Sequence, residues 1–168
     1  MGTIDTDMKK AFTLIELLVV IGVLAILLTI TLIAINPAHQ FAQSNDTKRR
    51  SDILAILNAV HQSTAENKGI LPAQIPDTTA GALEIKLDAV TPGADLCAVL
   101  APVYVPAFPV DPAVSYDGGT AAQGDPIPST ACAVAYNTGY TIVRDAGGRV
   151  TVSADSEVTP GTFLTVTR

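Results

Sequence analysis

Apolar residues dominate the chain from Phe12 to Ile35, and one acidic side chain, Glu16, interrupts them. After Glu16 the run carries no charge, and its one candidate helix breaker is Gly22. A helix over this run is about 36 Å long, enough to cross a bilayer core of about 30 Å. A secretory signal peptide has a shorter apolar core, of about 7–15 residues, and a small-residue cut site after it. The pattern predicts a membrane-spanning helix over residues 12–36 that stays attached.

A second helix is predicted over residues 37–68. Asn36 precedes Pro37, which pushes it out of the helical region, yet Asn-Pro also starts a new helix well. We therefore expect a kink or short break there, and a stop at Gly69. Residues 44–50 are polar all round, and an apolar stripe follows at spacings of three and four. The stripe comprises Ile53, Ile56, Leu57, Val60 and Thr64, and we expect it to pack on a small sheet.

Residues 69–168 are predicted to form an exported, β-rich head. Residues 70–130 are rich in Pro, Gly, Ala and Asp, with short elements expected only near 96–100 and 103–105. Later in the chain, the alternation of apolar and polar residues that is typical of strands becomes clearer. The predicted strands span residues 131–136, 140–144, 149–153 and 163–167, with a hairpin turn at 145–148. The expected fold class is α+β, with the C-terminal half of a long N-terminal helix packed on an antiparallel sheet of about four strands.

The formal net charge of −6 belongs to the head. Residues 69–168 hold ten acidic and four basic residues, whereas the charges before Gly69 cancel. An acidic surface repels nucleic acid and anionic lipid, so we expect no nucleic-acid partner.

Glu16 is the residue of the apolar run that most needs a partner. An ionised carboxylate inside a membrane is costly and is by default a sign of function. Lys9 and Lys10 lie just upstream and form a basic flank that stays in the cytoplasm.

The segment from Lys9 to Ile35, and above all Phe12-Thr13-Leu14-Ile15-Glu16, resembles the N-terminal signature of type IV pilins and of the pseudopilins of type II secretion. The resemblance implies a leader, residues 1–11, that a prepilin peptidase removes between Ala11 and Phe12 before methylating the new Phe12 amine. The family usually has Gly where this chain has Ala11, and both residues are small. It also implies a long helix that carries a small β-sheet head.

The same resemblance implies a role for Glu16 in assembly. Cleavage creates an α-amine, a group whose ordinary pKa of about 7.7–8.0 leaves it mostly protonated at neutral pH. The carboxylate four residues on would pair with this amine in its own or a neighbouring subunit and set the axial register of each added subunit. The implied partners are other copies or related subunits, the peptidase and methylase, and an assembly platform in the inner membrane. The head would lie outside the cytoplasmic membrane, and later in a surface pilus or an envelope pseudopilus.

Cys97 and Cys132 both fall in the head. In an exported domain an even number of cysteines makes a disulfide plausible, and two buried free thiols are the alternative. No CxxC spacing indicates zinc or thiol exchange.

Three acidic residues, Asp111, Asp117 and Asp125, lie in a glycine-containing region that could hold calcium. Their spacing is not that of an EF-hand, and acidic residues are common in solvated loops, so the main expectation is a chain without a metal or other cofactor. Lys48-Arg49-Arg50, with acids on both sides, is expected to form a charged collar that is solvated or lies between subunits.

The sequence predicts a structural subunit of the type IV pilin kind, held in the membrane and then polymerised. A type II secretion pseudopilin that drives export is an alternative within the same class. A membrane-anchored binding module that forms no polymer is an alternative of another class. An enzyme is not expected, because no nucleophile–base pair or metal set with a recognisable spacing appears in the sequence.

Overall fold

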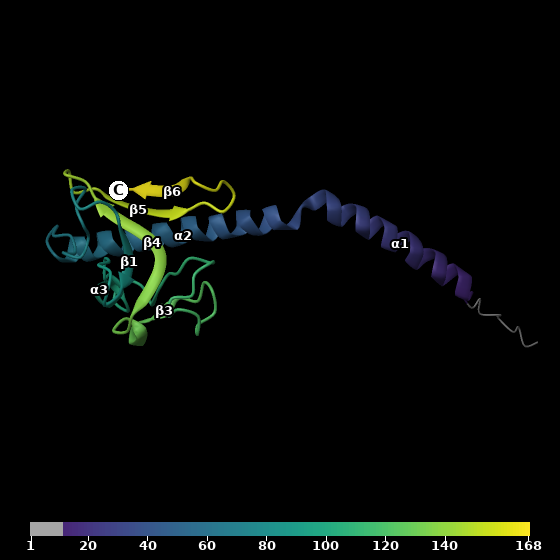
Figure 1. Cartoon of the computed structure of the whole chain (residues 1–168), viewed down its shortest axis with the longest axis horizontal. Helices are drawn as coiled ribbons and strands as arrows, with labels where there is room; N and C mark the ends of the chain where they lie inside the picture. Colours follow the sequence, from purple (N-terminus) through teal and green to yellow (C-terminus); the bar gives the residue numbers. More distant parts are fainter. Residues whose placement is uncertain (1–11) are drawn as a thin grey trace, which may run out of the picture. The chain divides into compact units, whose positions relative to one another are not determined.

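The computed structural model describes residues 12–168 (Figure 1). The expected leader and the Ala11 side of its cut lie outside these residues. The chain divides into two compact units, one ending at Gln40 and the other spanning Phe41–Arg168.

Two helices open the described part of the chain, and the boundary between the units falls within the first turn of the second helix. α1 spans Leu14–Ile35 and continues unbroken through Gly22. Asn36 then takes a left-handed conformation, with φ of 45°, and α2 begins at Pro37 and ends at Glu66. The break expected at Asn36-Pro37 is confirmed, because a proline cannot donate to the helical ladder and its predecessor leaves the helical region. After α2 the chain turns at Gly69, whose φ is 84°.

The second unit combines α2 with a four-stranded antiparallel sheet of order β1-β4-β5-β6, as the sequence predicted (Figure 1). The strands span Leu83–Leu87 (β1), Tyr136–Arg144 (β4), Val150–Asp155 (β5) and Phe163–Thr167 (β6). Smaller elements are α3 at Cys97–Leu100, the strand pair of β2 at Ala107–Phe108 with β3 at Ile127–Pro128, and a 3-10 turn at Ser129–Ala131.

The core of this unit lies between α2 and the sheet. The stripe of α2 is buried as expected at Ile53, Ile56, Leu57 and Val60, while Ser63 rather than Thr64 is the buried residue of its last turn. From the sheet, alternate residues of β4 and β5 join the same cluster. They include Tyr140, Ile142, Val150, Val152 and Ala154.

One predicted strand is absent from the structure, and one strand of the sheet was not predicted. Residues 131–136 do not form a strand, because a 3-10 turn occupies residues 129–131 and β4 begins only at Tyr136. The fourth strand is instead β1, whose sequence Leu-Glu-Ile-Lys-Leu alternates as a half-buried strand should.

A bulge in β4 shapes the side of the sheet that meets the loops. The pairing of β1 with β4 shifts between Glu84 and Lys86, so β4 carries extra residues there. The Thr138 hydroxyl donates to the Ile85 carbonyl at 2.8 Å, and Gly139 has a φ of 76°. A Cβ on Gly139 would lie 2.9 Å from the Asp111 Cβ and the Val114 Cγ2, so the bulge leaves room for the loop that carries Asp111.

Candidate functional site

The N-terminal candidate site is the first turn of α1. Thr13 is the N-cap, and its hydroxyl accepts a hydrogen bond from the Glu16 N–H at 3.3 Å. The Glu16 carboxylate in return accepts from the Thr13 N–H and hydroxyl, both at 2.9 Å. This reciprocal capping box gives partners to backbone N–H groups that have none within the helix at its N-terminus. It also places the acid where the helix dipole favours negative charge. Glu16 was predicted from the sequence and Thr13 was not, although Thr-x-x-Glu is the signature of such a box.

The remainder of α1 is an apolar helix with no buried residue in the single chain. Leu32 is 70% exposed and Ile33 is 78% exposed. Within the described residues, α1 is the one helix long and apolar enough to cross a membrane. An exposed apolar surface of this length is stable only against lipid or other apolar helices.

Beneath α2 the head buries a charged cluster centred on Arg49, which is 4% exposed. The guanidinium donates two hydrogen bonds to Asp111, from Nε to Oδ2 at 2.6 Å and from Nη2 to Oδ1 at 3.0 Å. Its Nη1 donates to Asp46 at 2.8 Å and to Glu157 at 3.3 Å. A buried guanidinium is tolerated only with such complete pairing.

Asp46 joins the helix to the turn between β5 and β6. Its carboxylate accepts the Ser156 hydroxyl at 2.6 Å and the backbone N–H groups of Glu157 and Val158 at 2.8 and 3.3 Å. Burial alone would raise the pKa of Asp46, but the hydrogen bonds from Ser156, Glu157 and Arg49 outweigh it and hold the pKa below its ordinary value. The pKa of Arg49 is raised, chiefly by the hydrogen bonds to Asp111, so the guanidinium stays charged.

One turn further along α2, Asp52 accepts a hydrogen bond from the buried Tyr140 hydroxyl at 2.9 Å. Burial raises the pKa of Asp52, and the Tyr140 bond offsets this only in part. The pKa of Tyr140 is raised as well, first by burial and then by the neighbouring Asp52 charge, so the phenol remains the donor.

The expected collar of Lys48, Arg49 and Arg50 is therefore not uniform. Arg49 faces the core, whereas Lys48 and Arg50 are exposed, and Lys48 donates to the Gly124 carbonyl at 2.9 Å. The prediction of a solvated or inter-subunit position is wrong for Arg49, because this residue lies four positions before Ile53 on the same helix face.

The three acids considered for calcium serve different purposes. Asp111 accepts hydrogen bonds from the Arg49 guanidinium. Asp117 accepts hydrogen bonds from backbone N–H groups of its own turn, among them that of Ala121 at 2.8 Å. Asp125 is exposed. Over residues 12–168 the structure contains no group of three or more His, Cys, Asp or Glu side chains arranged to hold a metal ion.

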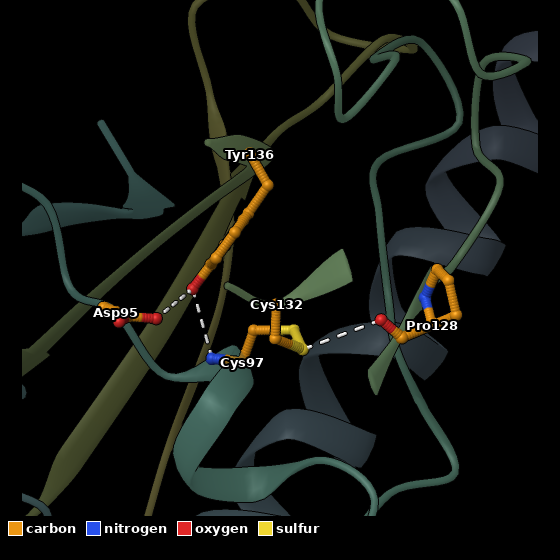
Figure 2. The surroundings of a disulfide bond; sticks show 5 residues. All are labelled: Asp95, Cys97, Pro128, Cys132 and Tyr136. Carbon is orange, nitrogen blue, oxygen red and sulfur yellow. Dashed lines mark hydrogen bonds between the residues drawn. A yellow bond between two sulfur atoms is a disulfide. The ribbon is translucent and has the colours of Figure 1, made fainter. Parts of the chain in front are cut away.

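Cys97 and Cys132 form a disulfide that ties α3 to the segment before β4 (Figure 2). Beside it, the Tyr136 hydroxyl accepts the Cys97 N–H at 3.1 Å and donates to Asp95 at 2.9 Å (Figure 2). Burial raises the pKa of Tyr136, so this phenol stays protonated and bridges α3 to the sheet. The bridged alternative for the two cysteines is confirmed.

Comparison with known proteins bears on the N-terminal site. A family model described as the prokaryotic N-terminal methylation motif matches residues 7–32. No curated protein and no solved structure matches the chain. The match supports the type IV pilin and pseudopilin signature, and together with α1 it indicates a membrane-anchored protein.

Proposed function

We propose that the protein is a structural subunit of a type IV pilus or similar filament, stored in the cytoplasmic membrane through α1 and polymerised after its leader is removed. The observation that carries this proposal is a single acid, Glu16, at the start of an apolar helix that buries nothing within its own chain. The methylation motif over residues 7–32 supports it. Proteins with this signature are structural rather than catalytic.

The chemistry of the N-terminus gives Glu16 two partners in turn. In the single chain its carboxylate is held by the Thr13 N–H and hydroxyl. Cleavage between Ala11 and Phe12 would create a cationic amine four residues away, which the methylase then modifies. In a bundle of α1 helices, where water is scarce, pairing this amine with a Glu16 carboxylate offsets part of the cost of burying the two charges. Apolar packing fixes no register along the helix axis, whereas this charge pair does.

The role of Glu16 is tested by Glu16→Ala, with Glu16→Asp as the control that keeps the charge. We expect Glu16→Ala to reach the membrane at normal levels but to form few or no filaments, since the amine loses its partner. Electron microscopy of sheared filaments, with an antibody against the head, measures the yield. A normal filament yield from Glu16→Ala would refute the register role.

Processing has its own test. Mass spectrometry of the mature protein should find Phe12 at the N-terminus with a methylated amine, and deletion of the prepilin peptidase should leave the longer precursor. Ala11→Gly restores the residue usual in the family and should be cut at least as fast. A precursor whose size does not depend on the peptidase would remove this part of the proposal.

A further inference from the structure

We propose that the free edge of β6 and the groove beside it receive an extended, acidic segment of a second copy of the chain. The inference deepens the proposed function, on which it rests, by assigning a contact between heads in addition to the contacts of α1.

The two edge strands of the sheet, β1 and β6, differ in how far other segments cover them. At the β1 edge the backbone of Gly93 and Ala94 lies against the strand, and the Ala94 N–H donates to the Glu84 carbonyl at 2.8 Å. A Cβ on Gly93 would lie 2.8 Å from the Lys86 carbonyl oxygen, so that edge is closely covered. β6 is the opposite edge, and it lacks the charge, proline and bulge that protect many edge strands: its sequence is Phe-Leu-Thr-Val-Thr, and its register is regular.

The hydrogen-bonding groups of this edge point outward. Val150 and Arg168 exchange both backbone hydrogen bonds, at 2.6 and 2.9 Å. Because an antiparallel ladder alternates, Phe163, Thr165 and Thr167 turn their N–H and C=O groups away from β5. Within the described residues no other segment pairs with these groups. They can bind an added strand.

An apolar groove of about 440 Å³ runs between β6 and α2. Leu54, 39% exposed, and Phe163, 66% exposed, line it together with Leu164 and Val166. A more polar hollow of about 770 Å³ continues it and shares Arg50, Phe163 and Leu164. The side chains of an added strand would therefore meet apolar surface next to the strand edge.

Arg50 selects the charge of the occupant. It is exposed in both hollows, and within residues 12–168 its guanidinium forms no salt bridge, whereas the adjacent Arg49 is fully paired. A guanidinium beside a strand edge binds a carboxylate with two hydrogen bonds. The head itself supplies carboxylates in excess, with ten acidic and four basic residues over 69–168.

Symmetry decides how the second copy binds. Pairing β6 with β6 would bring together two grooves of like charge, leave both Arg50 groups without a partner, and close the assembly at two subunits. Binding a different, acidic part of the next copy pairs Arg50 and leaves a free groove at the end of the assembly. Such head-to-tail contacts extend into filaments.

The test uses full-length protein in the native cell, with the photo-crosslinking residue p-benzoylphenylalanine placed at Thr165. The matched control carries it at Glu84, which is exposed on the covered edge. Irradiation should give a covalent dimer from position 165 and not from 84, and mass spectrometry should find the link in an acidic segment of the same chain. Arg50→Glu should lower the dimer yield about tenfold or more, Arg50→Lys should keep most of it, and Arg149→Glu, at an exposed position away from the groove, should leave it unchanged.

The outcomes separate this inference from the proposed function. Filaments without a link from Thr165 overturn the inference alone, as does a link to a different protein or from Thr165 to Thr165. A link to a second copy in cells that form no filaments upholds the inference and refutes the proposed function. Tyrosine fluorescence, which reports on the head because all four tyrosines lie there, verifies that the Arg50 variants fold.

Discussion

Arg49 and Asp111, 62 residues apart in the sequence, are joined in the core of the head by two hydrogen bonds of 2.6 and 3.0 Å. This pair fixes the loop that packs against the bulge of β4 to the middle of α2. Through Asp46 the same guanidinium also reaches the turn between β5 and β6. One residue of α2 thus anchors two loops of the sheet.

Removing the guanidinium should destabilise the head strongly. Arg49→Met keeps the apolar stem but leaves Asp46 and Asp111 buried without their cation, a defect that costs about 3–5 kcal/mol. Urea unfolding of the protein in detergent, followed by tyrosine fluorescence, measures the loss. Arg149→Met removes an exposed arginine that pairs only with Asp145 in its own turn and should leave the midpoint unchanged. Equal effects of the two substitutions would contradict a special role for Arg49.

Asp46 should make the head sensitive to acid. Its pKa in the folded state is lower than its ordinary value of 3.8, so its ionised form stabilises the fold above pH 3.8, and this contribution is lost as the pH falls through the folded-state pKa. Asp46→Asn should therefore lower the urea midpoint at pH 6 and lower it less at pH 3. A deficit that stays the same at both pH values would show that the charge of Asp46 is not responsible.

Asp52 should respond in the opposite sense. Burial raises its pKa in the folded state, so ionised Asp52 costs stability at neutral pH and the folded state gains as the pH falls through that pKa. Asp52→Asn keeps an acceptor for the Tyr140 hydroxyl and should be neutral or stabilising at pH 7. Asp52→Ala leaves that hydroxyl without its acceptor and should cost about 1–3 kcal/mol. Urea unfolding of both variants at pH 7 distinguishes the two effects, and a destabilised Asp52→Asn would refute the assignment.

Gly139 and Gly148 offer a matched pair of substitutions. Both have a positive φ, 76° and 79°, so alanine strains the backbone at either site by about 1–2 kcal/mol. At Gly148 the new Cβ meets nothing within 4 Å, whereas at Gly139 it lies 2.9 Å from the Asp111 Cβ. Gly139→Ala should thus lower the free energy of unfolding, measured in urea, more than Gly148→Ala does. It should also disturb the pairing of Asp111 with Arg49. Equal losses would mean that the loop moves aside freely.

The sequence predicted the helices, the break at Asn36 and three of the four main strands, because each rests on a local pattern. It also predicted the acid of the N-terminal site from its apolar surroundings. The strand β1 was missed because its five alternating residues lie in a region rich in Pro and Gly, where a short pattern carries little weight. The strand predicted at 131–136 was wrong: its residues alternate as in a strand, but Cys132, which forms the disulfide, lies in a turn.

The buried cluster was missed for a different reason. Arg49 and Asp46 are charged, so the polar stretch 44–50 favours a solvated surface. Extending the apolar stripe backwards from Ile53 by four, three and four positions arrives at Arg49, Asp46 and Ala42, all of which are buried. Helical spacing alone therefore places these residues on the core face. No local pattern, however, identifies Asp111 as the partner, because that contact depends on the fold.

The disulfide gives the last prediction. It closes a loop with a sequence separation of 35 residues between α3 and the segment before β4. In the loop-entropy model a bridge of this span stabilises the folded state by about 4 kcal/mol, mainly by restricting the unfolded chain. Replacing both cysteines by serine should lower the urea midpoint accordingly, and a reducing agent should produce a similar shift in the native protein but none in the variant. A reductant that shifts both proteins equally would show that the loss arises elsewhere.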